Sequence, residues 1–119
     1  MKMKNKIIIY GMPSCDTTAK GIKFLEENGF DFEFHNYKKS GVTREIIEMF
    51  FSILDKKEVV TPQGLIFKKL EKEVQEKIMN DNDYAIEKLI ENPFMINRPI
   101  VVKEAVAFSG FKEEVWKSL

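Results

Sequence analysis

The order of short apolar runs in the first 37 residues is the feature that most restricts the fold. The run Ile7–Tyr10 is β-branched and aromatic, which is typical of a buried strand. Residues Thr17–Asn28 follow with the spacing of an amphipathic helix, and Gly29 ends it. Phenylalanines then alternate with other side chains in a second strand, Phe30–Tyr37. A strand, a helix and a strand in so short a span predict a right-handed crossover between two parallel strands.

The middle of the chain carries helical patterns rather than strand patterns. Thr43 can cap a helix, and residues 73–79 and 83–91 predict two further short, charged helices around an apolar segment, Leu65–Leu70. We therefore expect a helical insertion over about residues 43–96. The apolar face of the first of these helices is formed by Ile46, Ile47, Phe50, Phe51 and Leu54.

The C-terminal part returns to strand patterns. Pro99–Val102 and Val106–Phe108 are apolar runs separated by polar residues, which predicts an antiparallel hairpin. Gly110 then precedes a terminal helix that carries Phe111 and Trp116. The sequence thus predicts an α/β fold in the order β-α-β, helical insertion, β-β-α, with residues 1–119 as one domain.

The charge balance argues against a nucleic-acid or membrane surface. Lysine and arginine number 19 and aspartate and glutamate also number 19, so no net field attracts polyanions. Ile7–Tyr10 is too short for a membrane span or the apolar region of a signal peptide. We expect a cytoplasmic protein with no direct contact to nucleic acid or membrane.

Cys15 is the only cysteine, and it lies where the first strand gives way to the first helix. One cysteine excludes an intramolecular disulfide and fits a reducing compartment. A helix N-terminus presents free N–H groups and a positive dipole, which favour the reactive thiolate. The alternative is a small apolar side chain buried in a turn.

His35, the only histidine, would be a base for Cys15 or a structural ring, and its place in the strand pattern favours the structural role. No cysteine or histidine cluster predicts a metal site.

Several motifs resemble the arsenate reductase (ArsC)/Spx-related family. They are Tyr10–Thr17, Phe34–Tyr37, Phe67–Leu70 and Asn92–Val102, and the segment Met95–Val102 is the most specific of them. The resemblance covers nearly the whole chain. It implies a thioredoxin-like fold with a mixed four-stranded sheet.

The resemblance also implies roles for individual residues. Cys15 matches the nucleophile that attacks the arsenic of arsenate, after which glutathione and glutaredoxin resolve the adduct. These would be external reductants, and no bound cofactor is expected. Arg98 matches the arginine beside the thiol, where its guanidinium would hold an oxyanion and favour the thiolate. The alternative is an ion pair between Arg98 and Glu87 or Glu91.

Three more residues complete the predicted substrate-binding set. Pro99 matches the proline that is cis in thioredoxin-like folds, although the sequence alone also allows an ordinary proline at the start of a strand. Backbone amides near Thr17 and Thr18 would cradle an anion. Thr18 stands where redox-switch members carry a second cysteine. Its hydroxyl would either donate a hydrogen bond to the thiolate or serve the start of the helix.

Two departures from the family pattern concern substrate binding. Arsenate reductases hold the oxyanion with two further arginines, but the matching segments here, residues 61–64 and 108–111, contain none. Each lost charge-assisted hydrogen bond is worth about 1.5–3 kcal/mol. Lys68 or Lys69 would be a substitute, although a lysine offers a point charge rather than a planar fork.

The resemblance leaves two active functions open, besides a family member that keeps the thioredoxin-like shape but has lost its chemistry. The first is a thiol-dependent oxidoreductase like the glutathione- and glutaredoxin-dependent arsenate reductases, acting on a small oxyanion or on a mixed disulfide with glutathione. The second is a transcriptional regulator like Spx, which binds the C-terminal domain of the RNA polymerase α subunit. In that case the surface near Gly11 and the central helices would matter more than the thiol.

Overall fold

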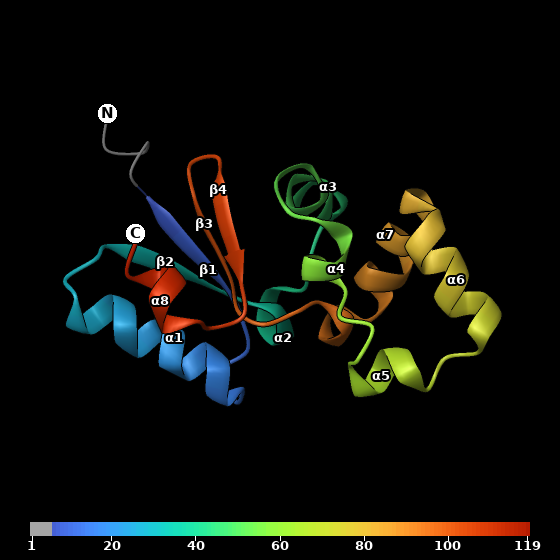
Figure 1. Ribbon diagram of the computed structural model, residues 1–119, viewed down its shortest axis with the longest axis horizontal. Coiled ribbons are helices and arrows are strands. Elements are labelled where there is room, and N and C mark those ends of the chain that lie inside the picture. Colours follow the sequence, from blue (N-terminus) through green and yellow to red (C-terminus); the bar gives the residue numbers. More distant parts are fainter. Residues whose placement is uncertain (1–5) are drawn as a thin grey trace. The chain divides into compact units, whose positions relative to one another are not determined.

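The computed structural model describes residues 6–119, and the contacts among them form two compact units (Figure 1). The sheet unit combines the described residues up to Ser40 with Arg98–Leu119. The helical unit is Gly41–Asn97. The chain therefore leaves the sheet unit after its first 40 residues and re-enters it just before the C-terminal strands.

The sheet unit contains one four-stranded sheet in the order β2-β1-β3-β4. β1 runs parallel to β2, with Ile7 opposite Phe32, and antiparallel to β3, with Tyr10 opposite Ile100. The hairpin of β3 and β4 is antiparallel. These pairings confirm the predicted crossover, the predicted hairpin and the mixed four-stranded sheet. The strands are β1 (Ile7–Gly11), β2 (Phe32–Asn36), β3 (Ile100–Lys103) and β4 (Val106–Ser109).

The second strand begins two residues later and ends one residue earlier than the alternating pattern predicts. It ends at Asn36 because the side chain of that residue accepts hydrogen bonds from the backbone N–H groups of Lys38 and Lys39, at 2.9 and 3.4 Å. These bonds cap the short helix α2 (Tyr37–Ser40). An asparagine that bonds to nearby backbone N–H groups competes with the strand ladder, and the pattern of apolar residues does not show this competition.

Helices α1 (Asp16–Glu27) and α8 (Glu113–Trp116) lie on the same side of the sheet (Figure 1). Gly21 allows their close approach, because a Cβ at this position would lie 2.6 Å from a ring carbon of Trp116 and 3.0 Å from Ile9. The Trp116 ring also packs edge-on against Phe24, with ring centroids 5.9 Å apart. The fully buried centre of this core is formed by Ile7, Ile9, Leu25, Val101 and Trp116.

The helical unit contains the insertion expected from the sequence, with more helices than the pattern indicates. The predicted helix after Thr43 and the two charged helices are present, each within one residue of the expected bounds. Two further short helices and a 3-10 turn join them, because single turns carry no apolar periodicity. The elements are α3 (Arg44–Ile53), α4 (Lys56–Val59), α5 (Leu65–Lys68), α6 (Lys72–Asn80), α7 (Asn82–Glu91) and η2 (Pro93–Met95).

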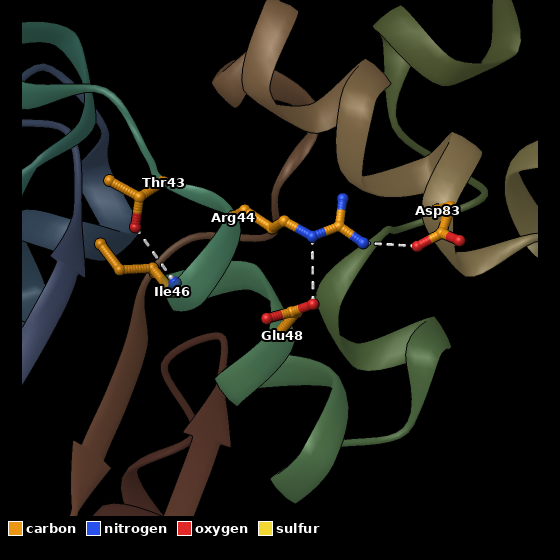
Figure 2. Close-up of polar contacts among 5 residues, drawn as sticks. All are labelled: Thr43, Arg44, Ile46, Glu48 and Asp83. Atoms are coloured by element: carbon orange, nitrogen blue, oxygen red, sulfur yellow. Dashed lines mark hydrogen bonds and ion pairs between the residues drawn. The ribbon is translucent and has the colours of Figure 1, made fainter.

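Helix α3 begins with a side-chain cap and is tied to α7 by charges (Figure 2). The Thr43 hydroxyl accepts a hydrogen bond from the backbone N–H of Ile46 at 3.2 Å, as the sequence predicts. Arg44 pairs with Glu48 at 3.1 Å one turn along the same helix, and with Asp83 at the start of α7. Within the helical unit, an isolated antiparallel bridge joins Val60 to Ile96.

Within residues 6–119, none of the helices has the length and apolar character that a membrane crossing requires.

Candidate functional site

Cys15 lies in the connection from β1 to α1 and is the N-cap residue of that helix. The connection is tight, because the Cys15 backbone N–H donates to the Met12 carbonyl at 3.1 Å. The Cys15 carbonyl accepts the first helical hydrogen bond, from Ala19 at 2.9 Å. The side chain is partly exposed, so the alternative of a thiol buried in apolar surroundings is wrong.

The pKa of the Cys15 thiol is lower than the usual value for cysteine. Partial burial raises the pKa, because it disfavours the charged thiolate. Hydrogen bonding from the hydroxyl of Thr17, and from the backbone and hydroxyl of Thr18, lowers it by more. The helix N-terminus therefore stabilises the thiolate through specific donors, which agrees with the expectation from its position in the sequence.

Thr17 joins the thiol to a segment far away in the sequence. Its Oγ1 lies 3.1 Å from the sulfur of Cys15. The same hydroxyl donates a hydrogen bond to the backbone carbonyl of Arg98 at 3.2 Å, across 81 positions of the chain. The side chain is on the exposed side of the first helical turn. Thr17 thus connects the nucleophile to the backbone that precedes β3.

Thr18 is fully buried between the first helical turn and the end of β1. Its hydroxyl accepts a hydrogen bond from the Met12 backbone N–H at 3.4 Å, and hydrogen bonding to Cys15 lowers the thiol pKa. Gly11 makes room for it, since a Cβ there would lie 2.5 Å from the Thr18 oxygen. Thr18 therefore holds the loop together and also contacts the sulfur, while the helix cap is Cys15 itself.

Arg98 precedes β3, and its guanidinium reaches the loop that carries the thiol. Its Nη1 donates to the thioether sulfur of Met12 at 3.0 Å. Its charge also lowers the pKa of Tyr37, although burial of that phenol and the neighbouring Tyr10 raise the pKa by more. Of the two carboxylates considered as alternative partners, Glu91 pairs with Lys88 at 3.5 Å within the helical unit.

Met12 is the site residue that sequence reasoning misses. It is buried, and its sulfur is the acceptor for the Arg98 guanidinium. A methionine in a four-residue turn has no periodic or motif signal, so only the tertiary contact reveals its role. A thioether is a weak acceptor, and a carboxylate or oxyanion would form a stronger hydrogen bond with the same guanidinium.

The peptide bond between Arg98 and Pro99 is cis, as the family resemblance implies. The alternative of an ordinary proline at the start of a strand is therefore wrong. Pro99 is buried directly before β3, and its carbonyl accepts a hydrogen bond from Gly110 at 2.7 Å. The pairing of Tyr10 with Ile100 places this segment beside the end of β1, next to the loop of Cys15.

His35 belongs to a cluster of aromatic rings at the ends of β1 and β2. Its ring centroid is 5.1 Å from that of Tyr10 and 6.0 Å from that of Tyr37. The two tyrosine rings also stack on each other, 6.4 Å apart. His35 is partly buried, and this packing agrees with the structural role that the strand pattern favours.

The two segments that lack the family arginines have structural contacts of their own. At the end of β4, the Gly110 carbonyl accepts a hydrogen bond from the Trp116 indole at 3.1 Å. In the helical unit, Thr61 starts a turn that Gly64 closes at 3.0 Å. Lys68 and Lys69 are exposed at the end of α5. Within residues 6–119, no group of three histidine, cysteine, aspartate or glutamate side chains is placed to hold a metal ion.

Comparisons with known proteins find similarity over nearly the whole chain. The sequence model of the ArsC family matches residues 10–119. The solved structure of a protein called YffB is 28% identical, with a TM-score of 0.85, and the match covers 94% of this chain and 96% of that one. A solved ArsC-related protein from Brucella melitensis is 30% identical, with a TM-score of 0.74, covering 95% of this chain and 92% of that one.

A curated relative is a regulator. The global transcriptional regulator Spx of Streptococcus pyogenes serotype M3 is 24% identical over 110 residues, which is 91% of this chain and 80% of that protein. The family match includes the loop of Cys15, the cis-proline segment and the last helix. This chain has a thioredoxin-like fold and belongs to the ArsC family.

Proposed function

We propose that this protein is a thiol oxidoreductase in which Cys15 is the nucleophile and glutathione is the reductant. The observation that carries the proposal is the Cys15 sulfur, which is partly exposed at the N-terminus of α1 with a lowered pKa. The thiolate is the form that attacks disulfides and oxyanions. Membership in the ArsC family supports this role. A glutathione-rich, reducing compartment is its expected location, and we propose the cytoplasm.

The reaction that fits a single cysteine is exchange with a mixed disulfide of glutathione. The Cys15 thiolate attacks the glutathione sulfur, a new S–S bond forms, and the old S–S bond breaks. The electron pair of the broken S–S bond goes to the sulfur of the other half of the mixed disulfide. That sulfur takes a proton from water and becomes a thiol. A free glutathione thiolate then attacks the glutathione sulfur bound to Cys15. This step releases glutathione disulfide and returns the Cys15 thiolate, so no second cysteine is needed.

Arg98 is the proposed anchor for a negative group of the substrate. Its guanidinium contacts the Met12 thioether, which a carboxylate or oxyanion would displace as the stronger acceptor. Thr17 and Thr18 would stabilise the thiolate before attack and the departing sulfur afterwards, and Pro99 would fix the backbone on which Arg98 is held. Glutathione carries two carboxylates, which makes it a suitable ligand for such a cation.

Arsenate is the less favourable substrate for this site. The segments 61–64 and 108–111 supply none of the additional arginines that hold the oxyanion in the arsenate reductases. Two missing charge-assisted hydrogen bonds, each worth about 1.5–3 kcal/mol, weaken the binding of a tetrahedral oxyanion strongly. We therefore expect arsenate reduction to be slow or absent, and glutathione mixed disulfides to be the better substrates. Glutaredoxin is the alternative reductant in the resolving step.

The first experiment measures the ionisation of the thiol. The rate of alkylation by iodoacetamide is recorded against pH for the native protein, with Cys15→Ser as the control for reaction at other side chains. We expect a midpoint below that of an unperturbed thiol, which is about 8.5. A midpoint at or above that value would contradict the proposal.

The second experiment measures turnover. The substrate is the mixed disulfide of glutathione and 2-mercaptoethanol, and the glutathione disulfide formed is followed with glutathione reductase and NADPH. We expect turnover with the native protein and none above the uncatalysed rate with Cys15→Ser. Arg98→Ala should raise KM by about tenfold or more, since one charge-assisted contact is lost, and Arg98→Lys by less. A native rate equal to the uncatalysed rate rejects the proposal.

A second candidate function rests on the similarity to Spx, a global transcriptional regulator. In this reading the protein binds the C-terminal domain of the RNA polymerase α subunit, and Cys15 is dispensable. Isothermal titration calorimetry with the purified α domain tests it. Binding that is equal in the native protein and in Cys15→Ser supports the regulator, and absence of heat exchange with both removes it.

A further inference from the structure

The hydroxyl of Thr17 has two partners but only one proton. Its oxygen lies 3.1 Å from the Cys15 sulfur and 3.2 Å from the carbonyl oxygen of Arg98. The carbonyl and a thiolate can only accept hydrogen bonds. A neutral thiol can also donate one. The hydroxyl therefore satisfies both neighbours only while the thiol keeps its own proton.

We propose that Thr17 is a positioning residue whose hydroxyl changes its hydrogen-bond partner when Cys15 ionises. In the thiol state, S–H donates to the Thr17 oxygen and the hydroxyl donates to the Arg98 carbonyl. In the thiolate state, the thiol proton has gone to solvent, and the hydroxyl turns and donates to the sulfur. The inference deepens the proposed function and rests on it only in taking the thiolate as the working form.

The strengths of the two hydrogen bonds favour this exchange. A hydrogen bond to an ionised acceptor is roughly twice as strong as one between neutral groups. Thr17 is exposed, so solvent can replace its hydroxyl at the Arg98 carbonyl. Thr18 differs because its side chain is fully buried, so solvent cannot take the place of its hydroxyl at another acceptor.

The exchange links the charge of the sulfur to the backbone of residue 98. The guanidinium of Arg98 contacts Met12 in the loop that carries Cys15. The Thr17 hydroxyl therefore connects the Cys15 sulfur to the backbone of the residue that carries this guanidinium. When Cys15 is part of a disulfide, its sulfur is no longer charged and is a poor acceptor. The hydroxyl then returns to the carbonyl, as in the neutral thiol, but the disulfide has no S–H that could donate to the Thr17 oxygen.

Other charged or titratable groups stand on the elements around Cys15. Asp16 follows it on α1, Arg98 precedes β3, and the rings of Tyr10, His35 and Tyr37 pack together at the ends of β1 and β2. A pH-dependent signal at residue 98 must therefore be assigned to the thiol by a variant that removes only the sulfur.

Nuclear magnetic resonance tests the exchange directly. The ¹³C shift of the Arg98 carbonyl is followed against pH in the native protein, in Cys15→Ser, in Thr17→Val and in Thr17→Ser. We expect a shift change at the midpoint of Cys15 ionisation in the native protein and in Thr17→Ser. The change should be absent in Cys15→Ser and much smaller in Thr17→Val. Equal changes in the native protein and Thr17→Val would overturn the proposal.

Alkylation by iodoacetamide gives a second readout that a purely structural role would not move. Loss of the Thr17 donor should raise the midpoint of Cys15 ionisation by about one pH unit in Thr17→Val, a tenfold change in the ionisation constant, while Thr17→Ser keeps the native midpoint. Thr43→Ala is the matched control, since it removes a threonine cap in the helical unit and should leave the midpoint unchanged. A Thr17→Val protein that is less stable but has the native midpoint contradicts the proposal.

Both measurements are made without substrate, so they can be separated from the proposed function. If turnover fails while the carbonyl shift follows the thiol, the oxidoreductase is rejected and the hydroxyl exchange stands. If turnover succeeds while Thr17→Val behaves like the native protein in both readouts, the exchange is rejected and the oxidoreductase stands.

Discussion

At the scale of single residues, the thiol of Cys15 depends on the two threonines that follow it by two and three positions. The sulfur contacts the Thr17 hydroxyl at 3.1 Å, and hydrogen bonding to Thr17 and Thr18 lowers the thiol pKa despite partial burial, which acts in the opposite direction. The guanidinium of Arg98 donates a hydrogen bond to the Met12 sulfur in the same loop. The ionisation of Cys15 is thus supported by hydrogen-bond donors of the first helical turn.

The lowered pKa of Cys15 makes the free energy of unfolding depend on pH. The folded thiol ionises at lower pH than the thiol of the unfolded chain, whose pKa is about 8.5. Between these two pKa values, unfolding takes up a proton, so the contribution to stability rises with pH and is complete above about 8.5. It is lost as the pH falls through the folded pKa.

Urea unfolding of the native protein and of Cys15→Ser, measured from about pH 6 to about pH 9.5, checks this dependence. The difference in unfolding free energy between the two proteins should rise in favour of the native protein across the window. A difference that is flat or falls with increasing pH would show that the thiol pKa is not lowered by folding.

At the scale of elements, the N-terminus of α1 differs from those of α3 and α7. Thr43 caps α3 and Asp81 caps α7, each by accepting a hydrogen bond from a backbone N–H of the first turn, at 3.2 and 3.1 Å. Cys15 occupies the same position in α1 but is not among the residues that cap helices well. The hydrogen-bond donors of Thr17 and Thr18 in the first turn of α1 are therefore directed at the thiol, whose pKa they lower.

Thr43 offers a direct measure of what an ordinary cap contributes. Thr43→Ala removes the acceptor for the Ile46 N–H and should lower the free energy of unfolding by about 1 kcal/mol. Thr43→Ser keeps the hydroxyl and should stay close to the native stability. The two variants are compared by urea denaturation, and equal losses in both would show that the hydroxyl is not the stabilising group.

The differences between predicted and observed elements have local causes. The second strand stops at Asn36 because its side chain caps α2, and this competing bond is invisible in the alternation of phenylalanines. The insertion contains the short helices α4 and α5, which are single turns and too brief to show a period. The longer helices and the other three strands agree with the prediction within one residue, because their apolar positions repeat.

At the scale of the whole molecule, the sheet order brings together residues that are far apart in the sequence. β1 lies between β2 and β3, and its antiparallel pairing with β3 puts the segment of Arg98 and Pro99 beside the loop of Cys15. The chain travels through the helical unit before it returns to this position (Figure 1). Thr17 can contact Arg98 because the chain returns to the sheet unit at this position.

The position of β1 predicts a gradient of protection from hydrogen exchange in the sheet unit. β1 is paired on both sides, and Ile7 and Ile9 are fully buried in the core, so its amides should exchange only through global unfolding. β4 is an edge strand in which Val106 is 54% exposed, and its unpaired amides should exchange faster. Native-state hydrogen exchange by NMR measures this order. Faster exchange in β1 than in β4 would contradict the sheet arrangement.

The sequence by itself determined the strand, helix and strand at the start, the C-terminal hairpin, and the place of the lone Cys15 at a helix N-terminus. These features depend on residue type and spacing over a few positions, and such patterns can be read directly. Only the tertiary structure decided that Arg98 contacts Met12 and that Thr17 bonds to the Arg98 carbonyl. Those facts depend on how β3 pairs with β1, and a contact across 81 positions has no local signal in the chain.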